Sequence, residues 1–282
     1  MYTAKFENSN GKIFYFGYKY GNIFDIDGLT GLDVSVSMSQ GFNQVGETVE
    51  NLSVESNQFE ISGILLGESK ESKRKMLSVF APLQKGKLTF ENKYFIDCVV
   101  KKTPIITIDK NDAKFELVLV AQYPYWQKSN IKSFVSGGYT PAFSFPVNYA
   151  LPHIFGEKNQ NAFMTCNNDG DVEAFYKLEF RSLSETTNPY IINVETQEFL
   201  KLNTTVTADD KITVYRSGGR LVVEKVTNDI VTDAFSALDE DSDLMYMHVG
   251  NNLIKADADN GADQLITTIT FYDTVVGVYE GI

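Results

Sequence analysis

Two histidines, His153 and His248, are the only imidazole side chains in the sequence. A catalytic triad needs a nucleophile, a base and an orienting carboxylate within mutual reach, and no G-x-S-x-G motif presents a serine nucleophile. His248 lies in the apolar stretch of residues 244–249, which predicts a strand. A histidine with satisfied hydrogen bonds is therefore the favoured interpretation. The residues predict no catalytic site and no enzyme.

Acidic residues alternate twice in a way that suggests calcium ligands. The first run contains Asp239, Asp241 and Asp243, and the second contains Asp257, Asp259 and Asp263. An EF-hand loop also needs glycine at its sixth position and glutamate at its twelfth, where the first run has Leu244 and Gly250. The second run fails in the same way, so solvated acidic turns are expected and no metal site is predicted.

The two cysteines, Cys98 and Cys166, fall in different predicted domains. Cys98 lies in the apolar run of residues 94–100, which predicts a buried free thiol and not a disulfide. Four Cys and His residues, scattered singly, do not form a zinc site. The glycine-rich phosphate-binding motifs do not occur either. No cofactor is predicted.

The charge balance is acidic, with 37 Asp and Glu against 25 Lys and Arg, a formal net charge of -12. Such a charge repels phosphate backbones, so no contact with nucleic acid is expected. The amino terminus lacks a secretion signal pattern, and no apolar run is long enough to span a bilayer. The sequence therefore predicts no membrane contact and synthesis in the cytoplasm.

The motif Tyr123-Pro124-Tyr125-Trp126 holds the only tryptophan and separates two β-rich halves. Pro124 cannot donate to a sheet ladder, so a strand over residues 114–121 should end before it. Residues 127–149 are polar and rich in glycine and proline, which is typical of a connector. We predict two domains, residues 1–130 and 131–282. Their junction would be formed by Tyr123, Pro124, Tyr125 and Trp126, with the aromatic rings packed against the second domain. An ordinary aromatic strand end fits these four residues equally well.

The first half has an alternating pattern over residues 33–40, where valine and methionine face one way and serine the other. This pattern predicts a half-buried strand, and the polar residues 41–51 predict an exposed loop. A second alternating run, residues 58–64, contains Gly63, which indicates a bulge or a close backbone approach.

One helix is predicted, over residues 69–80, because Met76, Leu77 and Phe80 recur at helical spacing. A single amphipathic helix in a β domain is expected to cover the open side of a sheet or barrel. Beyond it, residues 87–90 and 93–100 flank Glu91-Asn92 as a predicted hairpin.

The second half predicts strands at short intervals, separated by turns such as Ser217-Gly218-Gly219-Arg220 and residues 257–263. The predicted strands cover residues 174–181, 189–195, 198–202, 212–216, 221–225, 244–249 and 264–272. This spacing is typical of an antiparallel β-sandwich. The fold class predicted for the whole chain is mainly β.

Short motifs occur in a fixed order along both halves. The first half contains Ile26-Asp27-Gly28-Leu29-Thr30-Gly31-Leu32, the loop of residues 41–46, Ile61-Ser62-Gly63-Ile64, Phe80-Ala81-Pro82 before Gly86, and Tyr123-Pro124-Tyr125-Trp126. The second half contains Asn168-Asp169-Gly170-Asp171, Asn188-Pro189-Tyr190-Ile191, Thr196-Gln197-Glu198 and Gly250-Asn251-Asn252-Leu253-Ile254. In order and spacing these motifs resemble the distal tail proteins of long-tailed bacteriophages, the siphovirus tail family called Dit.

The resemblance implies an N-terminal β-barrel or sandwich with one helix, which closes a hexameric ring, and a C-terminal galectin-like β-sandwich. It also implies a virion structural protein at the tail tip. There the ring would join the tail-tube protein to a tail-associated lysin, tail fibre or receptor-binding protein of the baseplate.

A ring of identical subunits requires heterologous contacts between neighbouring copies. The loop of residues 41–51 and the outer face of the predicted helix are candidates for that contact, and plain solvent-exposed surface is the alternative. A second function also stays open, because a galectin-like sandwich could be a carbohydrate-binding module for host cell-surface glycans. Fold alone does not establish such a function.

Overall fold

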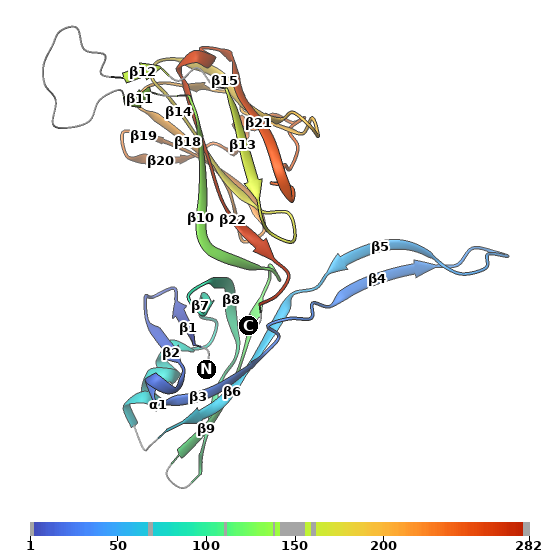
Figure 1. Ribbon diagram of the computed structural model, residues 1–282, viewed down its shortest axis with the longest axis vertical. Helices are drawn as coiled ribbons and strands as arrows, with labels where there is room; N and C mark the ends of the chain where they lie inside the picture. The colour runs from blue at the N-terminus through green and yellow to red at the C-terminus, as the bar shows by residue number, and fades with distance from the viewer. Residues whose placement is uncertain are drawn as a thin grey trace, which may run out of the picture. The chain divides into compact units, whose positions relative to one another are not determined.

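The computed structural model describes residues 3–66, 70–109, 112–137, 139–141, 156–158 and 162–278. The chain divides into two compact units (Figure 1). The first holds Met1–Asn130 and Thr274–Ile282, and the second holds Ile131–Asp273. The return of the chain to the first unit at Thr274 is a feature that the sequence pattern does not indicate. His153 lies outside the described residues.

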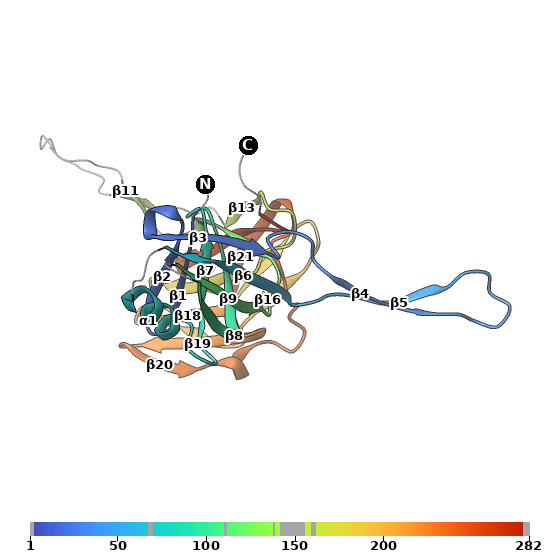
Figure 2. The same cartoon turned by 90° about the horizontal axis from the view of Figure 1, so that it is seen from below.

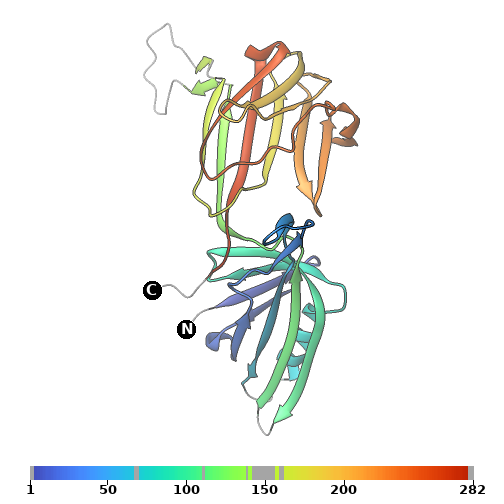
Figure 3. The same cartoon turned by 90° about the vertical axis from the view of Figure 1, so that its right-hand side faces the viewer.

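The first unit is built on an antiparallel sheet in the spatial order β2-β1-β7-β8-β9-β6-β3. The strands are β1 (Ala4–Asn8), β2 (Ile13–Phe16), β3 (Asn22–Asp27), β6 (Asn57–Leu65), β7 (Lys85–Phe90), β8 (Tyr94–Asp109) and β9 (Asp112–Ala121), with a 3-10 turn, η1 (Tyr18–Tyr20), after β2. The long strands β8 and β9 lie side by side (Figure 3). Glu91 and Asn92 both have positive φ, at 54° and 53°, as the predicted tight hairpin between β7 and β8 requires.

The predicted helix is confirmed as α1 (Lys70–Val79), which packs against β1, β2 and β8. Met76 is fully buried, and the ring of Phe80 stacks on that of Phe6 with centroids 4.7 Å apart. Leu77, expected on the same apolar face, is instead half exposed. Within the described residues, no helix is long and apolar enough to cross a membrane.

Gly63 marks a close backbone approach, as predicted. A Cβ atom at this position would lie 2.2 Å from the carbonyl oxygen of Ile23 and 2.7 Å from the ring of Phe115. Only glycine therefore allows β6 to pass between its neighbour β3 and the phenylalanine-rich core.

Strands β4 (Val34–Ser39) and β5 (Thr48–Val54) form a two-stranded ribbon that extends away from the rest of the first unit (Figures 1 and 2). A strand over residues 33–40 is thus confirmed, but its half burial is wrong, because every residue of β4 is exposed. The loop predicted over residues 41–51 is wrong in its second part, because Thr48 begins β5.

The second unit is a sandwich of two antiparallel sheets. One sheet has the order β10 (Trp126–Ser136), β22 (Leu265–Val275), β14 (Tyr176–Ser182), β18 (Asp210–Ser217), β19 (Arg220–Thr227) and β20 (Ile230–Asp233). The other has the order β13 (Phe163–Asn168), β21 (Gly250–Asn260), β15 (Thr186–Asn193) and β16 (Phe199–Lys201), and β17 (Thr205–Val206) also pairs with β15. Beside them lie the paired strands β11 (Tyr139–Pro141) and β12 (Gly156–Lys158) and the 3-10 turns η2 (Phe235–Ala237) and η3 (Ala262–Gln264).

Both sheets contribute fully buried side chains to one core, as the predicted β-sandwich requires. Phe180 and Ile269 come from the first sheet, and Ile191 and Ile254 come from the second. In strands such as β14, alternate residues face this core, which explains the period of two in the sequence.

Three predictions about local structure in the second half are wrong. Residues 244–249 do not form a strand, and Met247 makes only an isolated bridge to Ala174. Residues 127–136 belong to strand β10, not to a connector. Residues 257–260 belong to β21 and not to a turn. Lys255 pairs with Asp257 and Lys201 pairs with Asp259, so these acidic residues are compatible with a strand.

Candidate functional site

The exposed ribbon of residues 33–55, here called the arm, has one apolar and one polar face. Its apolar face consists of three directly opposed pairs, Val34 with Val54, Val36 with Leu52, and Met38 with Val49. Its polar face consists of Ser35 with Ser53, Ser37 with Asn51, and Ser39 with Thr48. Opposed residues share a face of a ribbon, so the apolar side chains form one continuous strip. Each of them is between 40% and 63% exposed.

The tip of the arm is held by one glutamine. The backbone N–H of Gln44 donates to the carbonyl of Gly41 at 3.1 Å, and its Oε1 accepts from the Gly41 N–H at 2.9 Å. Gln40 Nε2 donates to the carbonyl of Gln44 at 3.1 Å. This turn presents Phe42 and Val45 almost entirely to solvent.

The base of the arm is fixed to the first unit by short polar contacts. The Glu55 N–H donates to the carbonyl of Asp33 at 2.9 Å, which closes the ribbon. Below it, Asn57 Nδ2 donates to the carbonyl of Gly28 at 3.1 Å. Gly28 has φ of +91°, and a Cβ there would lie 2.2 Å from the carbonyl oxygen of Gln58. The position where the chain turns toward the arm therefore requires glycine.

An isolated two-stranded ribbon is marginally stable in water. The arm pairs with no other described strand, and its apolar face covers no described layer of the protein. Continuous apolar patches on soluble proteins usually mark interaction sites. The arm therefore offers recognition by burial of apolar surface against a layer that the described residues do not supply.

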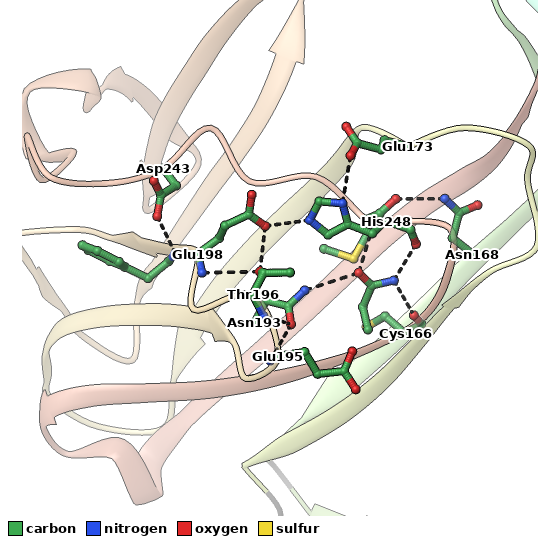
Figure 4. Close-up of polar contacts among 12 residues, drawn as sticks. Cys166, Asn168, Glu173, Asn193, Glu195, Thr196, Glu198, Asp243 and His248 are labelled. Carbon is green, nitrogen blue, oxygen red and sulfur yellow. Dashed lines mark hydrogen bonds and ion pairs between the residues drawn. The ribbon is translucent and has the colours of Figure 1, made fainter.

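On the second unit, His248 lies between two carboxylates (Figure 4). Its Nδ1 is 2.8 Å from Oε1 of Glu173, and its Nε2 is 2.7 Å from Oε2 of Glu198. Hydrogen bonds to Glu198 and Glu173 raise the pKa of His248 above its ordinary value. The bond to His248 holds the pKa of Glu198 below its ordinary value. Both ring nitrogens are engaged, which confirms a histidine with satisfied hydrogen bonds.

Asn252 supports the backbone at His248 and was not identified from the sequence. Its Oδ1 accepts from the His248 N–H at 3.0 Å, and its Nδ2 donates to the carbonyls of His248 at 2.7 Å and Cys166 at 3.2 Å. Asn252 is 1% exposed. Asn252 was quoted only as part of the motif of residues 250–254, and an amide within a strand, which is uncommon, was the sequence signal for a structural role.

The acidic runs considered for calcium hold backbone groups and lysines. Asp239 Oδ1 accepts from the Asp241 N–H at 3.0 Å, and Asp243 Oδ2 accepts from the Phe199 N–H at 3.0 Å. Asp259 pairs with Lys201 at 2.9 Å. Throughout the part of the chain that the structure describes, no group of three or more His, Cys, Asp or Glu side chains is placed to hold a metal ion.

Of the four residues expected at the domain junction, Trp126 begins β10 and the other three precede it. The expectation that the rings pack against the second domain is wrong for Trp126. Trp126 is fully buried in the core of the first unit, where its ring meets Phe59 edge-on at 5.3 Å. Pro124 is buried, and the Tyr123 and Tyr125 rings contact each other edge-on at 5.2 Å.

Both cysteines are buried free thiols, Cys98 in the first unit and Cys166 in the second. Burial raises the pKa of the Cys166 thiol to about 12 and raises that of Cys98 as well. Both thiols are therefore protonated at neutral pH and suit packing, not chemistry.

Comparison by sequence gives no match, either to a family model or to a curated protein. In structure, the chain is similar to the Dit protein of phage SPP1, described as a paradigm of the hub adsorption apparatus in phages that infect Gram-positive bacteria. The TM-score is 0.65 at 14% identity, over 96% of this chain and 98% of that chain.

Two structures of the baseplate of phage p2 in its activated conformation, one with Ca and one with Sr, are also similar. Their TM-scores are 0.55 and 0.54 at 12% identity, each covering 96% of this chain and 98% of the other. Because these similarities extend over almost the whole chain, this protein has the mainly β, two-unit fold of a Dit-type distal tail protein.

Proposed function

We propose that this protein is a structural component of the virion of a long-tailed bacteriophage. It would form the distal tail hub, a ring of about six copies between the tail tube and the tail tip. The observation that carries the proposal is the arm, whose apolar face lacks a covering layer. The fold shared with the SPP1 Dit hub and the p2 baseplate supports the same assignment.

A ring closes when each copy presents one surface to a different surface of its neighbour. The arm suits such a heterologous contact because it extends from the first unit and can reach another molecule (Figure 2). Each of the six side chains on its apolar face would contribute roughly 1 kcal/mol on burial, given that about half of its surface is still exposed. Summed over one arm, this is roughly 6 kcal/mol, comparable to the lower end of the entropic cost of association, so further contacts of the ring would have to add to it.

The proposed partners are a tail-tube protein on one face of the ring and, on the other, a tail-associated lysin, tail fibre or receptor-binding protein. We propose the first unit, residues 1–130 with the returning residues 274–282, as the ring-forming domain and residues 131–273 as the domain that carries tip proteins, with Tyr123 to Trp126 at the junction. The proposal assigns the protein no enzymatic activity.

Binding of cell-surface glycans by the second unit was the alternative function. A sugar platform is usually an exposed tryptophan or tyrosine ring, and the only tryptophan, Trp126, is fully buried in the first unit. The hub assignment is preferred because both the arm and the shared fold support it.

Negative-stain images of the purified full chain test the hub assignment. Closed rings are expected, because every copy carries the arm. A particle that stays monomeric at high concentration and with a tail-tube protein present would contradict the proposal.

A further inference from the structure

The helix α1 presents a basic outer surface. Its cations are Lys70, Lys73, Arg74 and Lys75, and its only acidic residue is Glu71. None of the four cations has an ion-pair partner in the described part of the chain. The chain as a whole has a formal net charge of -12, so this basic surface is a local exception.

The same surface of α1 includes an exposed leucine. Leu77 is 51% exposed. Residues three and four positions apart lie on one face of a helix, so Leu77 shares a face with Arg74 and Lys73. This face therefore offers both cations and apolar surface to another molecule.

A second leucine, Leu83, lies in the turn of residues 81–84 that follows the helix. The Gln84 N–H closes this turn on the carbonyl of Ala81 at 3.3 Å. Leu83 has φ of +62°, a conformation that leucine rarely adopts and that glycine or asparagine usually supplies in such a turn. It is also 87% exposed. A strained and exposed leucine contributes little to the isolated chain, which points to contact with another molecule.

The arm carries the opposite charge. Between residues 33 and 55 the chain has no lysine and no arginine, and its acidic residues are Asp33, Glu47, Glu50 and Glu55. All four are exposed, and none has an ion-pair partner among the described residues. Asp33 and Glu55 lie at the base of the arm, whereas Glu47 and Glu50 lie on its outer part. Glu50 is the extra residue of the β-bulge in the ribbon, and a bulge redirects the side chains around it.

The arm and α1 lie on opposite sides of the first unit (Figures 1 and 2). Each arm therefore extends away from the helix of its own chain. A heterologous contact joins two different surfaces of neighbouring copies. Complementary surfaces on opposite sides of one unit allow the same contact to repeat from copy to copy.

We propose that α1 and the turn of residues 81–84 are the receptor for the arm of a neighbouring copy. The cations of the helix pair with Glu47 and Glu50 of that arm, and Leu77 and Leu83 cover part of its apolar face. This pairing offsets the repulsion between copies that each carry a net charge of -12. The inference rests on the proposed hub function and names the second surface of its repeating contact.

Charge reversal in the full-length chain tests this contact. The arm variant is Glu47→Lys/Glu50→Lys, and the helix variant is Lys73→Glu/Arg74→Glu. Each variant alone should weaken self-association about tenfold or more, because like charges then face each other. Analytical ultracentrifugation over a concentration series measures the association constants.

The matched control for the helix variant is Lys177→Glu/Arg220→Glu on the second unit. Both residues are exposed, and the net charge changes by the same amount as in the helix variant. This control should associate as the wild type does. A second variant, Leu83→Asn, relaxes the turn and should weaken association without lowering the melting temperature.

An equimolar mixture of the arm variant and the helix variant distinguishes a lost contact from a lost fold. The reversed arm of one variant then meets the reversed helix of the other, and the two unchanged surfaces meet as in the wild type. We expect association to recover in particles that contain both variants, as native mass spectrometry would show. The wild type needs no substitution to be tested, because its association should weaken as salt rises from about 0.05 to 0.5 M.

The outcomes separate this inference from the hub assignment. Wild-type rings that are insensitive to salt and to both reversals, or folded variants that stay apart when mixed, would overturn the contact between arm and helix and leave the hub intact. A wild type that stays monomeric at every concentration would overturn both.

Discussion

Val36 and Leu52 lie directly opposite each other on the arm, and they are 43% and 63% exposed. Two apolar side chains on one face of a ribbon normally rest on a core. Here they rest on no described layer of the protein, and this relationship is the basis of the proposed assembly.

Replacing this pair with serine should separate the copies. In the Val36→Ser/Leu52→Ser variant we expect loss of rings, because the central pair of the apolar face is gone. The melting temperature of the monomer should change little, since exposed side chains contribute less than about 0.5 kcal/mol to folding. Size-exclusion chromatography with a thermal melt measures both. Ser35→Ala/Ser53→Ala on the polar face is the control and should still form rings.

Gly28→Ala should destabilise the first unit, because a Cβ at this position would lie 2.2 Å from a backbone oxygen. Gly31→Ala is the matched control: Gly31 also has positive φ, at +84°, but has no atom within 4 Å of the added Cβ. Both variants carry the conformational cost of about 1 kcal/mol. We expect Gly28→Ala to lose roughly 2 kcal/mol more in urea unfolding. Equal losses would show that the backbone contact at Gly28 is unimportant.

Lys132→Met should destabilise the second unit. Lys132 Nζ lies 2.8 Å from Oδ1 of Asp273, which is 4% exposed, and 2.6 Å from Oδ2 of Asp169. Removing the lysine takes one cation away from a buried carboxylate, which costs about 3 kcal/mol. Denaturant unfolding measures this loss, and Lys177→Met at an exposed position of β14 should cost less than about 0.5 kcal/mol.

The stability of the second unit should depend on the protonation of His248. Its pKa is raised from 6.5, so its contribution is complete below that value and is lost as pH rises through the raised pKa. The pKa of Glu198 is lowered from 4.5, so its contribution is complete above that value and is lost as pH falls through the lowered pKa. The pair therefore stabilises most between these two ordinary values.

His248→Gln tests this pH dependence. We expect its melting temperature to lie about 1–2 °C below that of the wild type near pH 6, and the difference to shrink at about pH 9. A difference that is constant with pH would mean that the charge of His248 contributes nothing.

The sequence predicted the positions of many strands better than the burial of their faces. Alternation at residues 33–40 shows that β4 has an apolar and a polar face, but period two carries no information about a layer above the apolar face. The strand β21 was not predicted, and at its end Asp257 and Asp259 have the composition of a turn. Their lysine partners, Lys255 and Lys201, provide the pairing that keeps them in a strand.

The polar cluster on the second unit was beyond prediction for a different reason. His248 meets Glu173 and Glu198, which are 75 and 50 residues away along the chain. Contacts of this range follow from sheet topology, and residue spacing does not encode them.

The mass of the purified protein in solution, measured by light scattering over a dilution series, tests the central claim most directly. The account predicts a particle of about 190 kDa, about six copies of the 31.6 kDa chain, and a single-chain mass for Val36→Ser/Leu52→Ser. A wild-type mass of one chain at every concentration, or a double variant that still forms the full particle, would contradict it.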